Sequence, residues 1–397
     1  MDITTLLPQT AVPVKRRVVT VKAGIPVYIY AVSLASLFTV IGILWDISWH
    51  KSIGRDKFLS PPHILIYLGA IFAGLFSGIQ VLVNTFSSDP IRKQGLVKVW
   101  GVFYSSLGAL FCIWGAIAML TSAPFDDWWH SAYGLDVTIL SPPHTLLGLG
   151  MLFLEFGACV SLSKYLNTAG EGRQAVLLQF LFIVCASSLL SLLYTLGSAY
   201  LRVHGMRSGL FYIVASFITL LFLPAFGRAL RMKWGMTAIA LGYFLISGSC
   251  NWILQLFPAE PKLGPILTHT THFQPSQFPL LIVVPAMAMD WILQRSKAND
   301  WTNAFLLGIA FVGALVAVQY PFSGFLLESP IAHGWFFGSQ SWYFGLSPEN
   351  PFRYKFHPSD IAAWPVLLEG LGIALLIGCA MARVSLRWGR WMQSIQR

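Results

Sequence analysis

The feature that most constrains this chain is a series of apolar runs, each about 20 residues long. A run of that length is what an α-helix needs to cross roughly 30 Å of hydrocarbon. Only 11% of the residues are charged, against about 25% in soluble domains. Because backbone amides inside a bilayer must be satisfied locally, we predict an all-α, polytopic transmembrane helical bundle of about ten spans. The runs lie at about 25–45, 62–83, 98–121, 143–163, 175–197, 208–227, 234–256, 277–294, 303–320 and 361–382.

The charge distribution predicts the orientation in the membrane. The net charge is +10, but the sequence has no basic, aromatic-rich patch or motif that would indicate nucleic acid. If the N-terminus is cytoplasmic, 18 of the 26 Lys and Arg residues fall on the cytoplasmic side, as the positive-inside rule expects. We therefore expect an integral protein of a bacterial inner membrane with both termini in the cytoplasm.

The chain divides into four predicted regions. A cytoplasmic tail at 1–24 precedes a duplicated pair of helical hairpins at 25–165. Further transmembrane helices follow at 166–382, with outer loops at 257–276 and 321–360, and a basic tail at 383–397 ends the chain. The five cysteines are scattered singly through the apolar runs, so neither a disulfide framework nor a thiolate metal site is predicted.

A tandem internal repeat contains the candidate site. The first copy is DISWHKSIGRDKFLSPPH at 46–63, and the second is DDWWHSAYGLDVTILSPPH at 126–144. Both continue as His-x-Leu-x-x-Leu-Gly, and repeats in membrane proteins usually mark duplicated supersecondary units. We predict two hairpins of the same orientation, with all nine histidines of the chain on the outer face.

Each copy of the repeat is expected to bring acidic and histidine side chains to the mouth of one hairpin. Asp46 and His50 lie four residues apart, so a helix projects both from one face. The Pro-Pro pair fits the first turn of the returning helix, which places the next histidine beside the end of the preceding helix. A carboxylate and two imidazoles form a metal-ligand set with positions left for water or substrate. The predicted ligands are Asp46, His50, His63, Asp126, His130 and His144. A purely structural network of Asp–His hydrogen bonds is the alternative.

Five other residues are predicted to support these sites. Asp56 and Asp136 could orient an imidazole through its free N–H, or cap the next helix. Asp127 makes the second copy the more acidic one. His269 and His272, in a later outer loop, could form a separate metal site or complete one begun in the repeats.

Three carboxyl groups are predicted inside spans, where they must face protein or a wet cavity: Glu155, Asp290 and Glu369. Each could relay protons or pair with a tyrosine or the backbone.

The spacing of the repeat resembles the copper-binding pattern in the C subunit of the membrane-bound copper monooxygenases, the particulate methane and ammonia monooxygenase family. The resemblance covers about 20 residues per copy. It implies one copper site at Asp46, His50 and His63, and a second at Asp126, His130 and His144, where the family uses an amide in place of the carboxylate. This chain departs from that subunit in its ten predicted spans and in its tandem hairpins, and it has no soluble cupredoxin-like region.

Three functions are compatible with these observations. The first is a metal-dependent membrane oxidoreductase, with copper as the expected cofactor, zinc or iron as alternatives, and an apolar small molecule as substrate. The second is a zinc-dependent membrane hydrolase, and the third is a non-enzymatic metal-binding or transport protein. The expected partners are the lipid bilayer and either other membrane subunits or further copies of the chain, but no nucleic acid.

Overall fold

The computed structural model describes residues 24–54, 56–134, 141–262, 270–339 and 349–396. Within these ranges, nine helices are long and apolar enough to cross a membrane, so the chain is an integral membrane protein with the predicted all-α, polytopic fold. They are α1 (Val27–Ser52), α2 (Pro61–Phe86), α4 (Leu107–Tyr133), α5 (Pro142–Thr168), α6 (Arg173–Leu196), α7 (Gly209–Leu230), α8 (Gly235–Leu254), α10 (Asp300–Glu328) and α11 (Trp364–Ser394).

Short elements join these helices. A one-turn helix and a two-stranded antiparallel hairpin connect α2 to α4, and short 3-10 turns lie before α7 and between α10 and α11. These elements are α3 (Pro90–Lys93), β1 (Val97–Val99), β2 (Phe103–Ser105), η1 (Val203–Gly205), η2 (Pro330–Ala332), η3 (Trp335–Phe337) and η4 (Pro358–Asp360).

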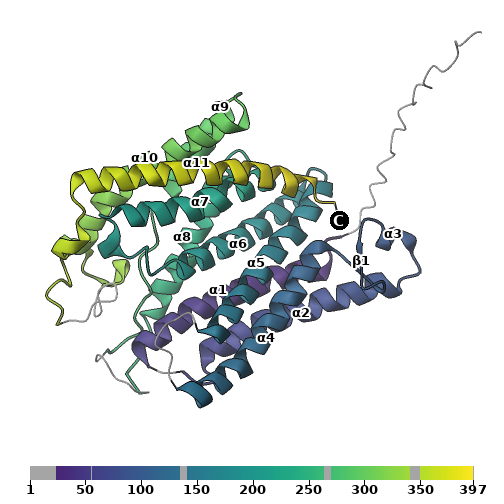
Figure 1. The fold of residues 1–397 in the computed structure, drawn as a ribbon. Coiled ribbons are helices and arrows are strands. Elements are labelled where there is room, and N and C mark those ends of the chain that lie inside the picture. The colour runs from purple at the N-terminus through teal and green to yellow at the C-terminus, as the bar shows by residue number, and fades with distance from the viewer. Residues whose placement is uncertain (1–23, 55, 135–140, 263–269, 340–348, 397) are drawn as a thin grey trace, which may run out of the picture.

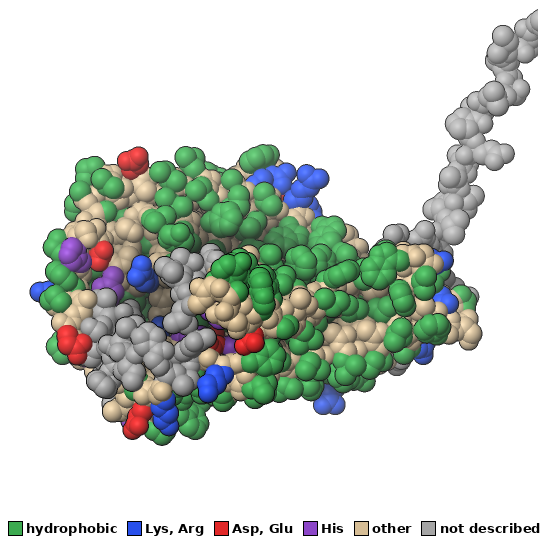
Figure 2. All heavy atoms as spheres, turned by 60° about the horizontal axis from the view of Figure 1, so that its bottom comes forward, with side chains coloured by type: hydrophobic (Ala, Val, Ile, Leu, Met, Phe, Trp, Pro, Cys, Tyr) green, Lys and Arg blue, Asp and Glu red, His purple; other side chains and the backbone are tan. Residues whose placement is uncertain are grey.

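The long helices lie side by side in one bundle, with α1, α2, α4 and α5 on one side and α7 and α11 on the other (Figure 1). We call the end at which α1 finishes at Ser52 and α2 begins at Pro61 the histidine end. Figure 2 shows hydrophobic side chains over most of the flank, while the histidines visible in that view lie toward one end of the molecule. This distribution suits a bundle whose flank meets lipid and whose ends meet water.

The two copies of the repeat form two helical hairpins, α1–α2 and α4–α5, as predicted, and α2 packs against α4. Glycines allow the backbones of α4 and α5 to approach closely, as is common between membrane helices. A Cβ atom at Gly115 would lie 2.6 Å from the backbone nitrogen of Leu154, and one at Gly108 would lie 2.5 Å from that of Ser161. The α4–α5 hairpin therefore has no room for a side chain at these glycines.

We predict that Gly115→Ala destabilises the protein by about 1–3 kcal/mol, the usual range for overpacking a close contact. The added methyl group meets backbone atoms of α5, which cannot rotate away. Thermal unfolding of the detergent-solubilised protein measures the effect. Gly78→Ala, in α2, is the matched control because nothing lies within 4 Å of its added Cβ. Equal melting temperatures for the two variants would contradict this account of the hairpin.

One predicted span, 277–294, is helical over only part of its length. The helix in this region is α9 (Val283–Arg295), whose 13 residues extend about 20 Å, too short to cross a bilayer alone. Residues 270–282, which precede it, are not helical. Pro279 disfavours a helix in the first part of this span, because it lacks the amide hydrogen that a helix would use at that position.

This non-helical segment and α9 together run antiparallel to α8 along its whole length. The Asn251 side-chain amide donates to the Gln277 carbonyl at 2.6 Å, and the Leu280 amide donates to the Tyr243 hydroxyl at 3.0 Å. At the far end, Asp290 accepts hydrogen bonds from the first turn of α8. Non-helical backbone at this depth is tolerated where protein groups satisfy it, as they do here. The segment therefore traverses the bundle in two parts, and the described chain begins and ends at the same end of the bundle (Figure 1).

Three predicted boundaries also change. The span expected at 98–121 starts later, because β1 and β2 occupy its first residues, and α4 runs from Leu107 to Tyr133. The outer loop expected at 321–360 starts later, because α10 continues through Pro321 to Glu328. The basic tail expected at 383–397 is largely helical, since α11 continues to Ser394 and its Arg383 pairs with Asp300 at 3.8 Å.

Candidate metal centre

The first candidate site forms where α1 ends and α2 begins. Asp46 and His50 lie on one face of the last turns of α1, as their spacing predicts. Gly54, with a φ of 104°, takes the chain out of the helix in a conformation that favours glycine. His63 follows the two prolines in the first turn of α2, and Asp56 lies in the connection between the helices.

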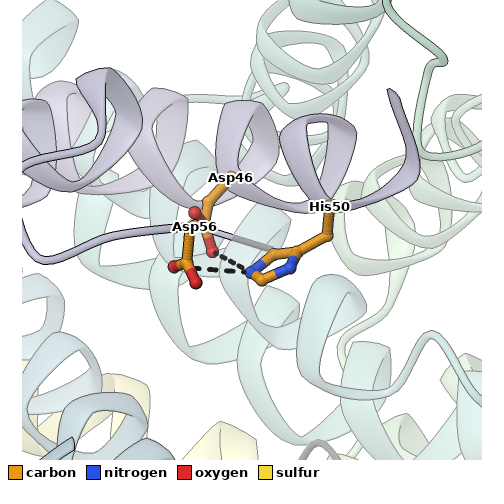
Figure 3. Close-up of side chains that lie close together, drawn as sticks. All are labelled: Asp46, His50 and Asp56. Carbon is orange, nitrogen blue, oxygen red and sulfur yellow. Dashed lines mark ion pairs between the residues drawn. The ribbon is translucent and has the colours of Figure 1, made fainter. Parts of the chain in front are cut away.

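These four side chains converge on one point at the histidine end. The Nε2 atom of His63 lies 3.4 Å from Asp46 Oδ1 and 2.6 Å from Asp56 Oδ2. The Nε2 atom of His50 lies 3.7 Å from Asp46 Oδ2 and 3.6 Å from Asp56 Oδ2. Figure 3 shows Asp46 and Asp56 on the same side of the His50 ring, with Asp46 and His50 projecting from α1. Both aspartates therefore contact both imidazoles.

The donor separations fit a metal ion. Asp46, His50 and Asp56 each offer one ligand atom, and these atoms lie within 4.8 Å of one another. Two donors about 2.1 Å from a common ion are roughly 3–4 Å apart, so three of the four His–Asp distances need little adjustment. The fourth, 2.6 Å between His63 and Asp56, is a direct hydrogen bond that an ion would replace. The donor set is nitrogen and oxygen only, which suits divalent copper or zinc.

Asp56 takes a larger part in this site than the sequence indicated. Burial alone would raise the pKa of the Asp56 carboxyl, but the hydrogen bonds from His50 and His63 outweigh it and hold that pKa well below its ordinary value. The carboxylate is therefore ionised at neutral pH and available as a ligand. Ser60, and not Asp56, is the N-cap residue of α2, so the structure favours the histidine-contacting role over the capping role.

The second copy of the repeat gathers its residues in the same way. The Oδ1 atom of Asp126 lies 3.5 Å from His130 Nε2 and 3.6 Å from His144 Nε2. The His130 Nδ1–H donates to the Gly134 carbonyl at 2.9 Å, and His144 Nδ1 lies 3.0 Å from the Ser141 hydroxyl. With each Nδ1 atom engaged in this way, both Nε2 atoms face Asp126, as ligand histidines are commonly oriented.

We predict that Ser141→Ala lowers the metal affinity of the second site by about 10–100-fold, the usual effect of removing a group that orients a ligand histidine. Ser60→Ala is the matched control, because Ser60 occupies the equivalent position in the first copy but accepts from the Lys57 amide instead of contacting a histidine. Titration of each purified variant with Cu²⁺ measures the two affinities. A loss of the same size in both variants would contradict the orienting role of Ser141.

A tyrosine that the sequence analysis did not single out lies between the two sites. Tyr67 is one turn after His63 on α2, and the ring centres of the two residues are 6.0 Å apart. Its phenol interacts electrostatically with Asp46 and Asp56 of the first site and with Asp126 of the second. The two clusters are therefore neighbours across the α2–α4 contact. The sequence offers one sign that Tyr67 differs from its surroundings: the equivalent position in the second copy of the repeat is Gly148.

The remaining predicted residues have lesser roles or fall outside the described chain. Asp127 is exposed on α4, while Asp136 and His269 lie outside the described residues. His272 is exposed, and its loop packs on the end of α1, where the Gln274 amide donates to the Ser52 hydroxyl at 2.7 Å. This loop therefore lies near the first site, but His272 is not among its contacting groups.

Comparison of this chain with protein-family models, with curated proteins and with solved structures finds no match. Any statement about function therefore depends on the geometry of the two clusters.

Proposed function

We propose that this protein binds two metal ions at the outer face of a bacterial inner membrane and acts as a copper-dependent membrane oxidoreductase. The observation that carries the proposal is the convergence of Asp46, Asp56, His50 and His63 within hydrogen-bond or near-contact distance at a helix-hairpin mouth. Among the described residues, the second hairpin brings two histidines, His130 and His144, to one aspartate, Asp126. Both termini would be cytoplasmic, which the positive-inside bias supports.

The chemistry of the donors supports divalent copper as the ion. Imidazole nitrogen and carboxylate oxygen are good ligands for Cu²⁺, whose affinity for such sites exceeds that of the other first-row divalent metals. A bound copper ion would supply one-electron redox chemistry. The residues would hold it at the membrane end of the bundle, beside a hydrophobic flank that an apolar substrate could reach from the bilayer (Figure 2).

Zinc-dependent hydrolysis is the second candidate, and Asp56 is the observation that favours it. This carboxylate lies 2.6 Å from the Nε2 atom of His63 and 3.6 Å from that of His50, so it could accept a hydrogen bond from a water molecule on a zinc ion held by those imidazoles and orient that water. A transport role has less support. Only one of the three carboxyl groups predicted inside spans, that of Glu155, is fully enclosed.

Metal analysis of protein purified in detergent separates these candidates. The proposal predicts bound copper with a divalent-copper spin-resonance spectrum split by nitrogen ligands, and oxygen consumption that requires an electron donor and an apolar substrate. Bound zinc with ester or amide hydrolysis would support the hydrolase instead. An absence of tight metal binding would contradict both enzymatic candidates.

A further inference from the structure

Three carboxyl groups were predicted inside spans, and the structure gives them different surroundings. Asp290 accepts hydrogen bonds from two backbone amides and a hydroxyl at the start of α8, which is a helix-capping role. Glu369 is exposed on α11. Glu155, in the middle of α5, is 0% exposed. Of the three, Glu155 alone is fully enclosed by protein and lies away from a helix end.

Among the described residues, the surroundings of Glu155 supply one hydrogen bond and no positive charge. The Ser36 hydroxyl, on α1, donates to Glu155 Oε2, while Oε1 has no hydrogen-bond partner among the described residues. The titratable groups that face it from α4, α5 and α6 are thiols: Cys112, Cys159 and Cys185. An ionised carboxylate there would keep an unpaired charge in a medium of low dielectric, where such a charge is very unfavourable.

The enclosure of Glu155 limits what could neutralise it. Its side chain is 0% exposed, and its Oε1 atom is buried without a hydrogen-bond partner among the described residues. A proton needs no added volume, whereas a metal ion would need several donors around it, and the thiols and Glu155 do not form a ligand cluster among the described residues. The ligand that fits this position is a proton.

We propose that Glu155 is a proton-binding site in the membrane interior and is a neutral carboxylic acid at neutral pH. It is distinct from the metal clusters, because Ser36 lies ten residues before Asp46 on α1, about 15 Å along the helix. The proposal therefore does not depend on whether those clusters bind metal. Release of the proton would require α1 and α5 to separate enough for water to reach Oε1. The protonation state of Glu155 would therefore change when this contact between the two helices opens.

Infrared spectroscopy of the full-length protein in lipid tests this proposal directly. A protonated carboxyl group has a carbonyl stretch separate from the bands of carboxylates and amides. We expect that band at pH 7 in the wild-type protein, with a small shift in D₂O that develops slowly because the group is enclosed. Glu155→Gln should abolish the band, and Glu369→Gln, which alters an exposed carboxylate, should retain it.

A second measurement covers the case in which Glu155→Gln does not fold. Wild-type protein made with carboxyl-¹³C-labelled glutamate should show the band displaced by the isotope, which labelled aspartate should not do. Absence of a protonated-carboxyl band at pH 7, persistence of the band in folded Glu155→Gln, or a band that responds to aspartate labelling would each overturn the proposal.

Discussion

Asp46→Asn is expected to weaken Cu²⁺ binding at the first site by more than about 100-fold, beyond the 10–100-fold loss usual for residues that only support a ligand. Asp46 contacts the Nε2 atoms of both His50 and His63 from the end of α1, and only 13% of its side chain is exposed. The amide keeps the size of the carboxylate but removes the negative charge that would neutralise the ion. Competitive titration of the purified variant with Cu²⁺ and a chelator of known affinity measures the change.

Asp127→Asn is the matched control for this substitution. It removes one carboxylate of the repeat region, but from an exposed position on α4. Its Cu²⁺ affinity and stoichiometry should equal those of the wild type. If Asp46→Asn folds normally and binds Cu²⁺ as tightly as Asp127→Asn does, then Asp46 is not a ligand, and the first cluster is a structural hydrogen-bond network.

His130→Ala is expected to remove one of two bound copper ions while leaving the other in place. The His130 ring is fixed by its bond to the Gly134 carbonyl and directs Nε2 at Asp126, so its loss leaves the second site without a main donor. The double variant Asp46→Asn/His130→Ala should contain no tightly bound copper. Elemental analysis after dialysis against a weak chelator gives the number of ions per chain for each protein.

The pattern of loss also reports whether the two clusters act separately. Distinct sites that share no ligand should lose their ions independently, since effects at such sites usually add. Tyr67 interacts with carboxylates of both clusters, so its replacement by phenylalanine should leave two ions bound if the clusters have separate ligands. Loss of both ions from His130→Ala alone would contradict two independent sites and would indicate a shared centre.

Much of the fold could be predicted because apolar length and the duplicated motif are local properties of the sequence. The Asp46–His50 spacing and the paired prolines were sufficient to predict two hairpins whose aspartate and histidine side chains converge. The segment at 277–294 could not be assigned correctly from hydropathy, because an extended chain buried against α8 is as apolar as a helix. In this segment, hydrogen bonds to side chains replace those of a helix. One example is the bond from the Leu280 amide to the Tyr243 hydroxyl, which joins residues 37 positions apart in the sequence.

The parts of the site that the sequence leaves open depend on contacts between segments. The sequence allows Asp56 either to orient an imidazole or to cap the next helix, and its contact with His63 after the turn at Gly54 supports the first role. Tyr67 was not considered, because nothing in a single sequence shows that α2 packs against α4. The close approach of Glu155 to Ser36 similarly joins residues 119 positions apart.

The measurement that tests the central claim most directly is the copper stoichiometry and spin-resonance spectrum of the detergent-purified wild-type protein beside the Asp46→Asn/His130→Ala double variant. Two copper ions per chain with nitrogen hyperfine structure in the wild type, and none in a folded double variant, is the predicted result. Equal copper content in the two proteins, or a wild-type protein that binds no divalent metal, would contradict it.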